Sequence, residues 1–272
     1  MMRTPLSLLA AAAAALAVAG APQNAGADAA GVQLAWHLAP SAAYTSSTHM
    51  SHVVSYDMNG TLKALMGSRA DDVTILEDRA VSTTTGSTGA VDEEIADQRR
   101  YGGTDPKDTS VQKRTASYKG AIAPDGECTP SDEPLVDAGA GALAQLPSGP
   151  IQTGATWTFT RRILVERDLG SGTMTYTDTL TRVDTRGGHQ IAVVDVKGAG
   201  RVDLTSDLQA KGFHTTDMAL EGTGEFDVTA GLPGVGHYTA HAEWTTRLLG
   251  VKVGIIFDDT YDATPWVAGK SP

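Results

Sequence analysis

The histidines are the first residues to test for chemistry, because imidazole binds metals and exchanges protons near neutral pH. His237 and His241 are four residues apart, a spacing that would bring two metal ligands together on a helix. The residues around them instead alternate in polarity, as in a strand: Tyr238, Ala240, Ala242 and Trp244. On a strand the two histidines share a face but lie about 13 Å apart, too far to bind one metal. His49 and His52 fall on opposite faces. We therefore expect solvent-facing histidines at 237 and 241 and no metal site.

Acidic side chains also occur in adjacent groups, at Asp71-Asp72, Asp92-Glu93-Glu94 and Asp258-Asp259. Neighbouring residues on a strand point to opposite faces, so Asp258 and Asp259 do not reach one ion, and the alternating ligands of a calcium loop are missing. We interpret these acids as a solvated surface. Paired acids for glycoside hydrolysis need only meet in space, and nothing in the sequence singles out such a pair.

Motifs of nucleophilic and nucleotide chemistry are missing. There is no H-E-x-x-H, C-x-x-C or G-x-S-x-G pattern, and Ser171 between two glycines is typical of a turn. Gly139 to Ala144 match the loose G-x-G-x-x-A pattern, but no hydrophobic strand precedes them and Pro147 ends the segment. The sequence therefore predicts no catalytic residue, no cofactor and no metal.

The N-terminus has the layout of a secretory signal peptide. Arg3 precedes an apolar run from Leu6 to Gly20, which is too short to span a bilayer. Cleavage sites of the A-x-A type end at Ala19 and Ala27, and both stay open. No cysteine follows the run, which excludes a lipid anchor at the N-terminus. We predict a signal peptide over 1–27 and a periplasmic or extracellular mature protein.

Composition excludes several partners. The formal net charge is −11 and no basic stripe offsets it, which argues against nucleic acid and against an anionic membrane surface. No further apolar run reaches 18 residues, so we expect no transmembrane segment in the mature chain. Cys128 is the single cysteine, so no internal disulfide forms. We expect it to be an exposed thiol rather than the link of a covalent dimer, and the oligomeric state stays open.

Around these residues, the elements alternate with period two. In the N-terminal β half, 28–123, His52 to Met58 alternate and lead into Asn59-Gly60, which predicts a tight hairpin. The segment 90–101 fits a charged edge strand better than a short helix. In the C-terminal β half, 157–272, turns are predicted at Gly170–Gly172, Gly187-Gly188 and Pro233-Gly234.

A connector, 124–156, separates the two halves. It contains a short, marginal helix that begins near Pro134 and ends before Pro147. Pro147, Pro150 and Gly154 then form a rigid crossing into Trp157, which we expect to be buried where the halves meet. The predicted fold is mainly β, with long antiparallel strands in curved, half-barrel-like meander sheets and one short helix joining the halves.

The crossing carries a resemblance. Leu146-Pro147, Pro150-Ile151, Gly154 and Trp157 resemble the central (F/L)P-x-x-P-V-x-x-G-D-x-W hinge of a family of uncharacterised bacterial exported β-rich proteins. Ile151 replaces the usual valine, and Ala155 stands where that family has an acid. The resemblance implies a fold and a compartment but no reaction. At the level of fold, it extends to the half-barrels of envelope lipid carriers.

Two classes of function fit these observations. The first is a non-catalytic envelope protein that binds an apolar or amphiphilic ligand such as lipid, or acts as a scaffold. The second is a secreted hydrolase whose active site is not recognisable from sequence. For the first class, the large aromatic residues of both halves are the candidate ligand-lining residues: Trp36, Tyr56, Trp157, Phe159, Tyr176, Tyr238 and Trp244.

Overall fold

The computed structural model describes residues 31–67, 72–86, 90–102, 111–129, 145–165 and 170–269. The strands and helices described below all lie within the compact unit Gly31–Pro272. The predicted signal peptide and the predicted helix over 134–144 lie outside the described residues.

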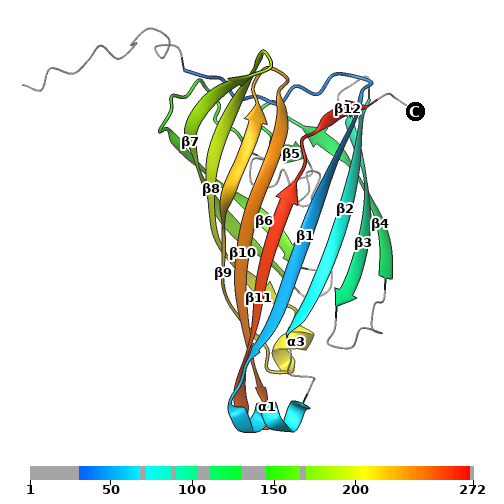
Figure 1. Cartoon of the computed structure of the whole chain (residues 1–272), viewed down its shortest axis with the longest axis vertical. Helices are drawn as coiled ribbons and strands as arrows, with labels where there is room; N and C mark the ends of the chain where they lie inside the picture. Colours follow the sequence, from blue (N-terminus) through cyan, green and yellow to red (C-terminus); the bar gives the residue numbers. More distant parts are fainter. Residues whose placement is uncertain are drawn as a thin grey trace, which may run out of the picture. The chain divides into compact units, whose positions relative to one another are not determined.

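The described residues of this unit form twelve strands and two short helices (Figure 1). The first half contains β1 (Ala43–Asp57), α1 (Gly60–Met66), β2 (Val73–Thr85), β3 (Ala90–Gly102), β4 (Val111–Ile122) and β5 (Cys128–Thr129). The second half contains β6 (Thr156–Val165), β7 (Gly170–Arg186), β8 (His189–Leu204), α3 (Ser206–Ala210), β9 (His214–Asp227), β10 (Leu232–Leu248), β11 (Val251–Ala263) and β12 (Val267–Gly269). The fold is mainly β with long antiparallel strands, as the alternation predicted, and 90–101 is a strand.

The strands form one curved antiparallel sheet in the order β5-β4-β3-β2-β1-β11-β10-β9-β8-β7-β6, and β12 also pairs with β1 (Figure 1). Each half is a meander, and the two meanders join where β1 pairs with β11 from Thr48–Ala263 to Asp57–Gly254. The halves therefore share one sheet. Trp157 lies on β6, at the end of the strand order and away from the β1–β11 pairing, and it is half-buried rather than buried. It packs against an apolar cluster to which both halves contribute.

The sheet has an inner face that carries the buried side chains and an outer face in solvent. Along β7, for example, Met174, Tyr176 and Leu180 are buried, whereas Thr173 and Thr175 are exposed or half-buried. The outer residues of the neighbouring strands are also polar: Asp195, Lys197, Glu221, Thr223, Thr239, Asp258 and Asp262. Alternation thus places one face against the core and the other in water. Within the described ranges, no helix has the length and apolar character needed to cross a bilayer.

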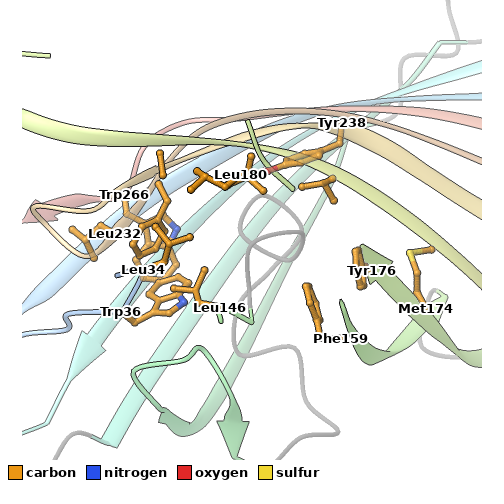
Figure 2. Close-up of a cluster of buried hydrophobic side chains, with 14 of the residues drawn as sticks. Leu34, Trp36, Leu146, Phe159, Met174, Tyr176, Leu180, Leu232, Tyr238 and Trp266 are labelled. Carbon is orange, nitrogen blue, oxygen red and sulfur yellow. The ribbon is translucent and has the colours of Figure 1, made fainter. Parts of the chain in front are cut away.

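Two apolar clusters lie on the inner face, one toward each end of the strands. The larger includes Trp36, Phe226 and Trp266, with Trp36 packed edge-on against both other rings (Figure 2). The segment before β1 reaches this cluster, because Val32 pairs with Ile151. The smaller cluster contains Val202, Leu204 and Trp244, with side chains at and after α3 packed against it: Leu208 and Phe213.

Three turn predictions need correction. Asn59-Gly60 does not form a tight hairpin: Asn59 caps α1, and its side chain accepts a hydrogen bond from the Leu62 N–H at 2.9 Å. Gly170–Gly172 lie inside β7, where a Cβ at Gly170 would stand 2.5 Å from the Asp203 carbonyl oxygen of β8. These glycines thus permit close strand approach rather than a turn.

Pro233-Gly234 lie inside β10, beside an irregularity in its pairing with β9, and the turn precedes them. The turn at Gly187-Gly188 is confirmed, because both residues have positive φ (59° and 88°) between β7 and β8.

Candidate functional site

The seven candidate ligand-lining residues are divided between the two ends of the inner face. Trp36, Phe159, Tyr176 and Tyr238 belong to the larger cluster, and Trp157 packs against it. Trp244 belongs to the smaller cluster. Tyr56 is half-buried on β1. The structure therefore brings five of the seven together and separates Trp244 from them.

One row across the inner face contains both of the buried carboxyl groups of the described residues, Asp178 and Glu77. Directly paired residues of an antiparallel sheet point to the same face. Strand pairing from β7 to β2 places the following residues in this row: Asp178, Val196, Gly222, Tyr238, Tyr261, Met50 and Glu77. We call it the polar row. Asp178 and Glu77 lie at its two ends.

Asp178 is the most unusual member of the polar row. Its side chain is fully buried, and neither carboxylate oxygen has a hydrogen-bond partner among the described residues. Trp157 is paired with it on β6, and Tyr176 and Leu180 are its neighbours on the same face of β7. Burial alone raises the pKa of Asp178 from 3.8 to about 8, so the carboxyl group is mostly protonated at pH 7. A neutral carboxyl group is able both to donate and to accept a hydrogen bond.

Tyr238 is a second buried group without a partner. Only 1% of the residue is exposed, and its hydroxyl makes no hydrogen bond. The ring lies beside Gly222 of β9, where an added Cβ would stand 2.6 Å from the ring carbon Cδ1, so glycine at 222 leaves space for it. Burial raises the pKa of Tyr238, and the charges of Asp178 and Tyr176 raise it further. Asp178 and Tyr238 lie in the same row of the inner face, on β7 and β10, with Val196 of β8 and Gly222 of β9 paired between them.

At the other end of the polar row, buried charges compensate one another across the junction of the two halves. His52 Nδ1 lies 3.0 Å from Asp259 Oδ1, and His52 Nε2 lies 3.8 Å from Glu77 Oε2. Arg79 Nη2 donates to Glu77 Oε1 at 3.0 Å, and the Tyr261 hydroxyl donates to Asp259 Oδ2 at 2.9 Å. We call these five residues the junction network.

The pKa of His52 reflects this environment. Burial on its own would lower the pKa, but hydrogen bonding and charge from Asp259 and Glu77 raise it from 6.5 to about 9. His52 is therefore a cation at neutral pH. Its Nε2 atom is hydrogen-bonded to no hydroxyl group, so among the described residues it is not paired with a nucleophile.

The remaining histidines of interest lie on the outer face, as predicted. His237 and His241 are each more than half exposed, and each pairs with an aspartate of β11: Asp262 at 2.6 Å and Asp258 at 2.7 Å. His49 pairs with Asp78 at 2.7 Å, on the face opposite His52. Within the described part of the chain, no group of three or more His, Cys, Asp or Glu side chains is placed to hold a metal ion.

Sequence reasoning missed the buried polar groups, although a signal for Asp178 was present. This aspartate occupies a position of the apolar alternation Met174, Tyr176, Leu180, where a strand buried on one face places a hydrophobic residue. Glu77 breaks the alternation of Ile75 and Val81 in the same way. A charged residue at a position where the alternation requires an apolar one is therefore the sequence signal that would have identified both Asp178 and Glu77. Cys128 lies in β5, and its side chain is outside the described part of the structure.

Comparison with known proteins adds little to this geometry. No family model matches the chain, and no curated protein matches it. Among solved structures, a point mutant of the Rh. blastica porin covers 81% of this chain and 99% of its own length, at 9% identity and a TM-score of 0.26. An outer membrane channel from Pseudomonas putida F1 covers 85% and 97%, at 8% identity and a TM-score of 0.24. TM-scores at this level carry no argument about function, so the function must be inferred from the inner face itself.

Proposed function

We propose that this chain is an exported, non-catalytic β-sheet protein of the bacterial cell envelope that binds an amphiphilic ligand, such as a lipid, on its inner face. The observation that carries the proposal is the pair Asp178 and Tyr238. Buried polar groups are almost always hydrogen-bonded, and leaving one unpaired costs about 1–3 kcal/mol. Two such groups in one row of the inner face, among apolar side chains, are explained if a ligand supplies the missing partners.

The chemistry of the pair defines what the ligand presents. A protonated Asp178 donates one hydrogen bond and accepts another, and the Tyr238 hydroxyl does the same. A hydroxyl, ester or amide group on the ligand matches both. The stacked rings of Phe159 and Tyr176, 4.9 Å apart, offer an apolar surface to the rest of the molecule. A polar head on a hydrocarbon tail combines the two requirements.

Native mass spectrometry of the protein purified from its own host tests this proposal. We expect a bound mass on the wild-type protein that Asp178→Leu reduces at least about tenfold, because 1.4 kcal/mol of lost interaction is a factor of ten. Asp195→Asn, an exposed change on the outer face of β8, is the matched control and should keep the ligand. A wild-type protein free of any bound molecule contradicts ligand binding and leaves a scaffold role.

Export and family membership are further parts of the proposal. The basic start and the apolar run over 1–27 support a signal peptide, and N-terminal sequencing of the mature protein tests it. We expect a new N-terminus directly after Ala19 or Ala27. The Leu146 to Trp157 spacing supports membership of the exported β-rich family, which an alignment of homologues would test. No observation on the described residues favours the hydrolase alternative.

A further inference from the structure

The turn between β10 and β11 breaks two rules of hairpin design at once. Leu249 and Gly250 form the turn with positive φ angles of 51° and 81°. Such a turn normally has Asn or Gly at its first position, because a leucine side chain is strained there. Directly beside it, Arg247 and Lys252 are paired across the two strands, and like charges in that position repel.

Neither feature is explained by packing. Leu249 is 76% exposed, the highest value among the exposed large hydrophobic residues of the described chain. Arg247 Nη1 donates to the Gly250 carbonyl at 3.3 Å, and both Arg247 and Lys252 are exposed. A strained, exposed leucine between two cations is unfavourable for an isolated protein. It is therefore better explained by a surface that the turn contacts.

Helix α1 presents the same combination at the same end of the sheet. It follows β1, whose last residue, Asp57, is paired with Gly254 near the start of β11 (Figure 1). Leu65 on α1 is 71% exposed, second only to Leu249 among the exposed large hydrophobic residues of the described ranges, and Lys63 of the same helix is also exposed. We call Lys63, Leu65, Arg247, Leu249 and Lys252 the basic tip.

The charge of the basic tip is opposite to that of the chain. The net charge of the protein is −11, yet 58–67 and 244–257 contain no acidic residue. The nearest acids of the neighbouring strands, Asp57 and Glu243, lie near Gly254, two residues behind Lys252. The net charge predicted that the chain avoids anionic membrane surfaces, but that expectation does not hold for this end. An anionic surface would attract this end and repel the rest of the molecule, which orients the chain with the basic tip toward that surface.

We propose that the basic tip docks on an anionic lipid bilayer and inserts Leu249 and Leu65 at the boundary between headgroups and acyl chains. Exposed aliphatic side chains flanked by Lys and Arg are the composition of interfacial membrane anchors. A stable protein interface needs roughly 800 Å² on each partner, which a hairpin turn and one face of a two-turn helix do not provide. With three cations and two leucines, we expect this binding to be weak, reversible and sensitive to salt.

Vesicle co-sedimentation of the full mature chain tests the proposal. The probes are vesicles of phosphatidylglycerol and phosphatidylcholine in equal parts, and vesicles of phosphatidylcholine alone. We expect binding to the anionic vesicles only, and weaker binding as salt rises. Near an anionic surface each Lys or Arg contributes about fivefold in binding, so Arg247→Gln with Lys252→Gln should weaken it about 25-fold.

Leu249→Asn separates lipid binding from folding. Asparagine suits the positive φ at this position, so thermal stability should stay the same or rise, whereas vesicle binding should fall about tenfold. Val267→Asn, at an exposed position in β12, is the matched control and should bind as the wild type does. The proposal is overturned if the wild type does not sediment with anionic vesicles, or if Leu249→Asn instead abolishes a dimer or the capture of an acidic polypeptide.

Discussion

Glu77 and Asp178 are two buried acids in opposite situations. Both lie in the polar row of the inner face, and their residues are 1% and 0% exposed. Glu77 contacts Arg79 and His52, and strand pairing also places Arg99 opposite it. Asp178 has no hydrogen-bond partner, and burial keeps its carboxyl group protonated at neutral pH.

The difference separates a structural role for Glu77 from the ligand-binding role that we propose for Asp178. The junction network lies where β1, β2 and β11 meet, so its charges hold together strands from the two halves of the chain. Asp178 forms no hydrogen bond to another strand among the described residues. An unpartnered acid in the core lowers stability, and such groups persist where a ligand, rather than the fold, uses them. Substitutions in the junction network and at Asp178 should therefore change the stability of the fold in opposite directions, and the changes should depend differently on pH.

The largest expected effect is the removal of Glu77. Glu77→Ala should lower the free energy of unfolding by roughly 3–5 kcal/mol, because it removes the buried carboxylate that Arg79 and His52 both contact. Denaturant melts measure the loss. Asp78→Ala is the control one residue away: Asp78 pairs with His49 on the exposed face, where an ion pair contributes less than about 1 kcal/mol. If the two variants lose the same free energy of unfolding, the junction network does not have the structural role that we assign to it.

Asp178→Asn should raise the free energy of unfolding, whereas Glu77→Ala should lower it. Folding raises the pKa of this carboxyl from 3.8 to about 8, so only the unfolded chain ionises between these values, and wild-type stability falls as pH rises from 4 to 8. Asparagine does not ionise, so the variant should be more stable, by on the order of 3 kcal/mol at pH 8 and by less at pH 5. Thermal melts across this range measure the difference. A variant that is less stable at pH 8 would mean that the carboxylate has a partner.

His52→Gln should produce a loss that depends on pH. The pKa of His52 rises from 6.5 to about 9 on folding, so its contribution is complete below pH 6.5 and disappears as pH rises through 9. We expect the variant to lose about 2 kcal/mol at pH 6 and almost nothing near pH 10, since the side chain is one-fifth exposed and solvent weakens the interaction. A loss independent of pH would indicate packing rather than charge.

The smallest effect comes from a matched pair of hydroxyl deletions in the polar row. Tyr261→Phe removes a hydrogen bond to the Asp259 carboxylate and should cost roughly 1.5 kcal/mol. Tyr238→Phe removes a hydroxyl that has no partner and should change stability by less than about 0.5 kcal/mol. With ligand bound, however, Tyr238→Phe should weaken ligand binding and Tyr261→Phe should not. The reverse pattern would place the ligand at the junction network.

Much of the fold was predictable because strand formation leaves a local record. Period-two alternation predicted the strands, including the charged segment of β3, and predicted that His237 and His241 face solvent. The turn at Gly187-Gly188 was predictable for the same reason, since positive φ at two adjacent positions favours glycine. The structure at Asn59-Gly60 was not predictable in this way. The same dipeptide either starts a helix or closes a hairpin, and the following residues, Thr61 to Met66, favour a helix.

The sequence by itself determined which residues alternate between the two faces of a strand, which turns need glycine and that the net charge is negative. All of these properties depend on near neighbours or on composition. Only the tertiary structure decided that β1 pairs with β11, about 200 residues later in the chain. That pairing brings His52 to Asp259. Asp178, on β7 between β6 and β8, has no hydrogen-bond partner among the described residues. The physical reason is that a buried charge is stabilised or destabilised by whatever strand packs beside it, and local sequence does not specify a partner so distant along the chain.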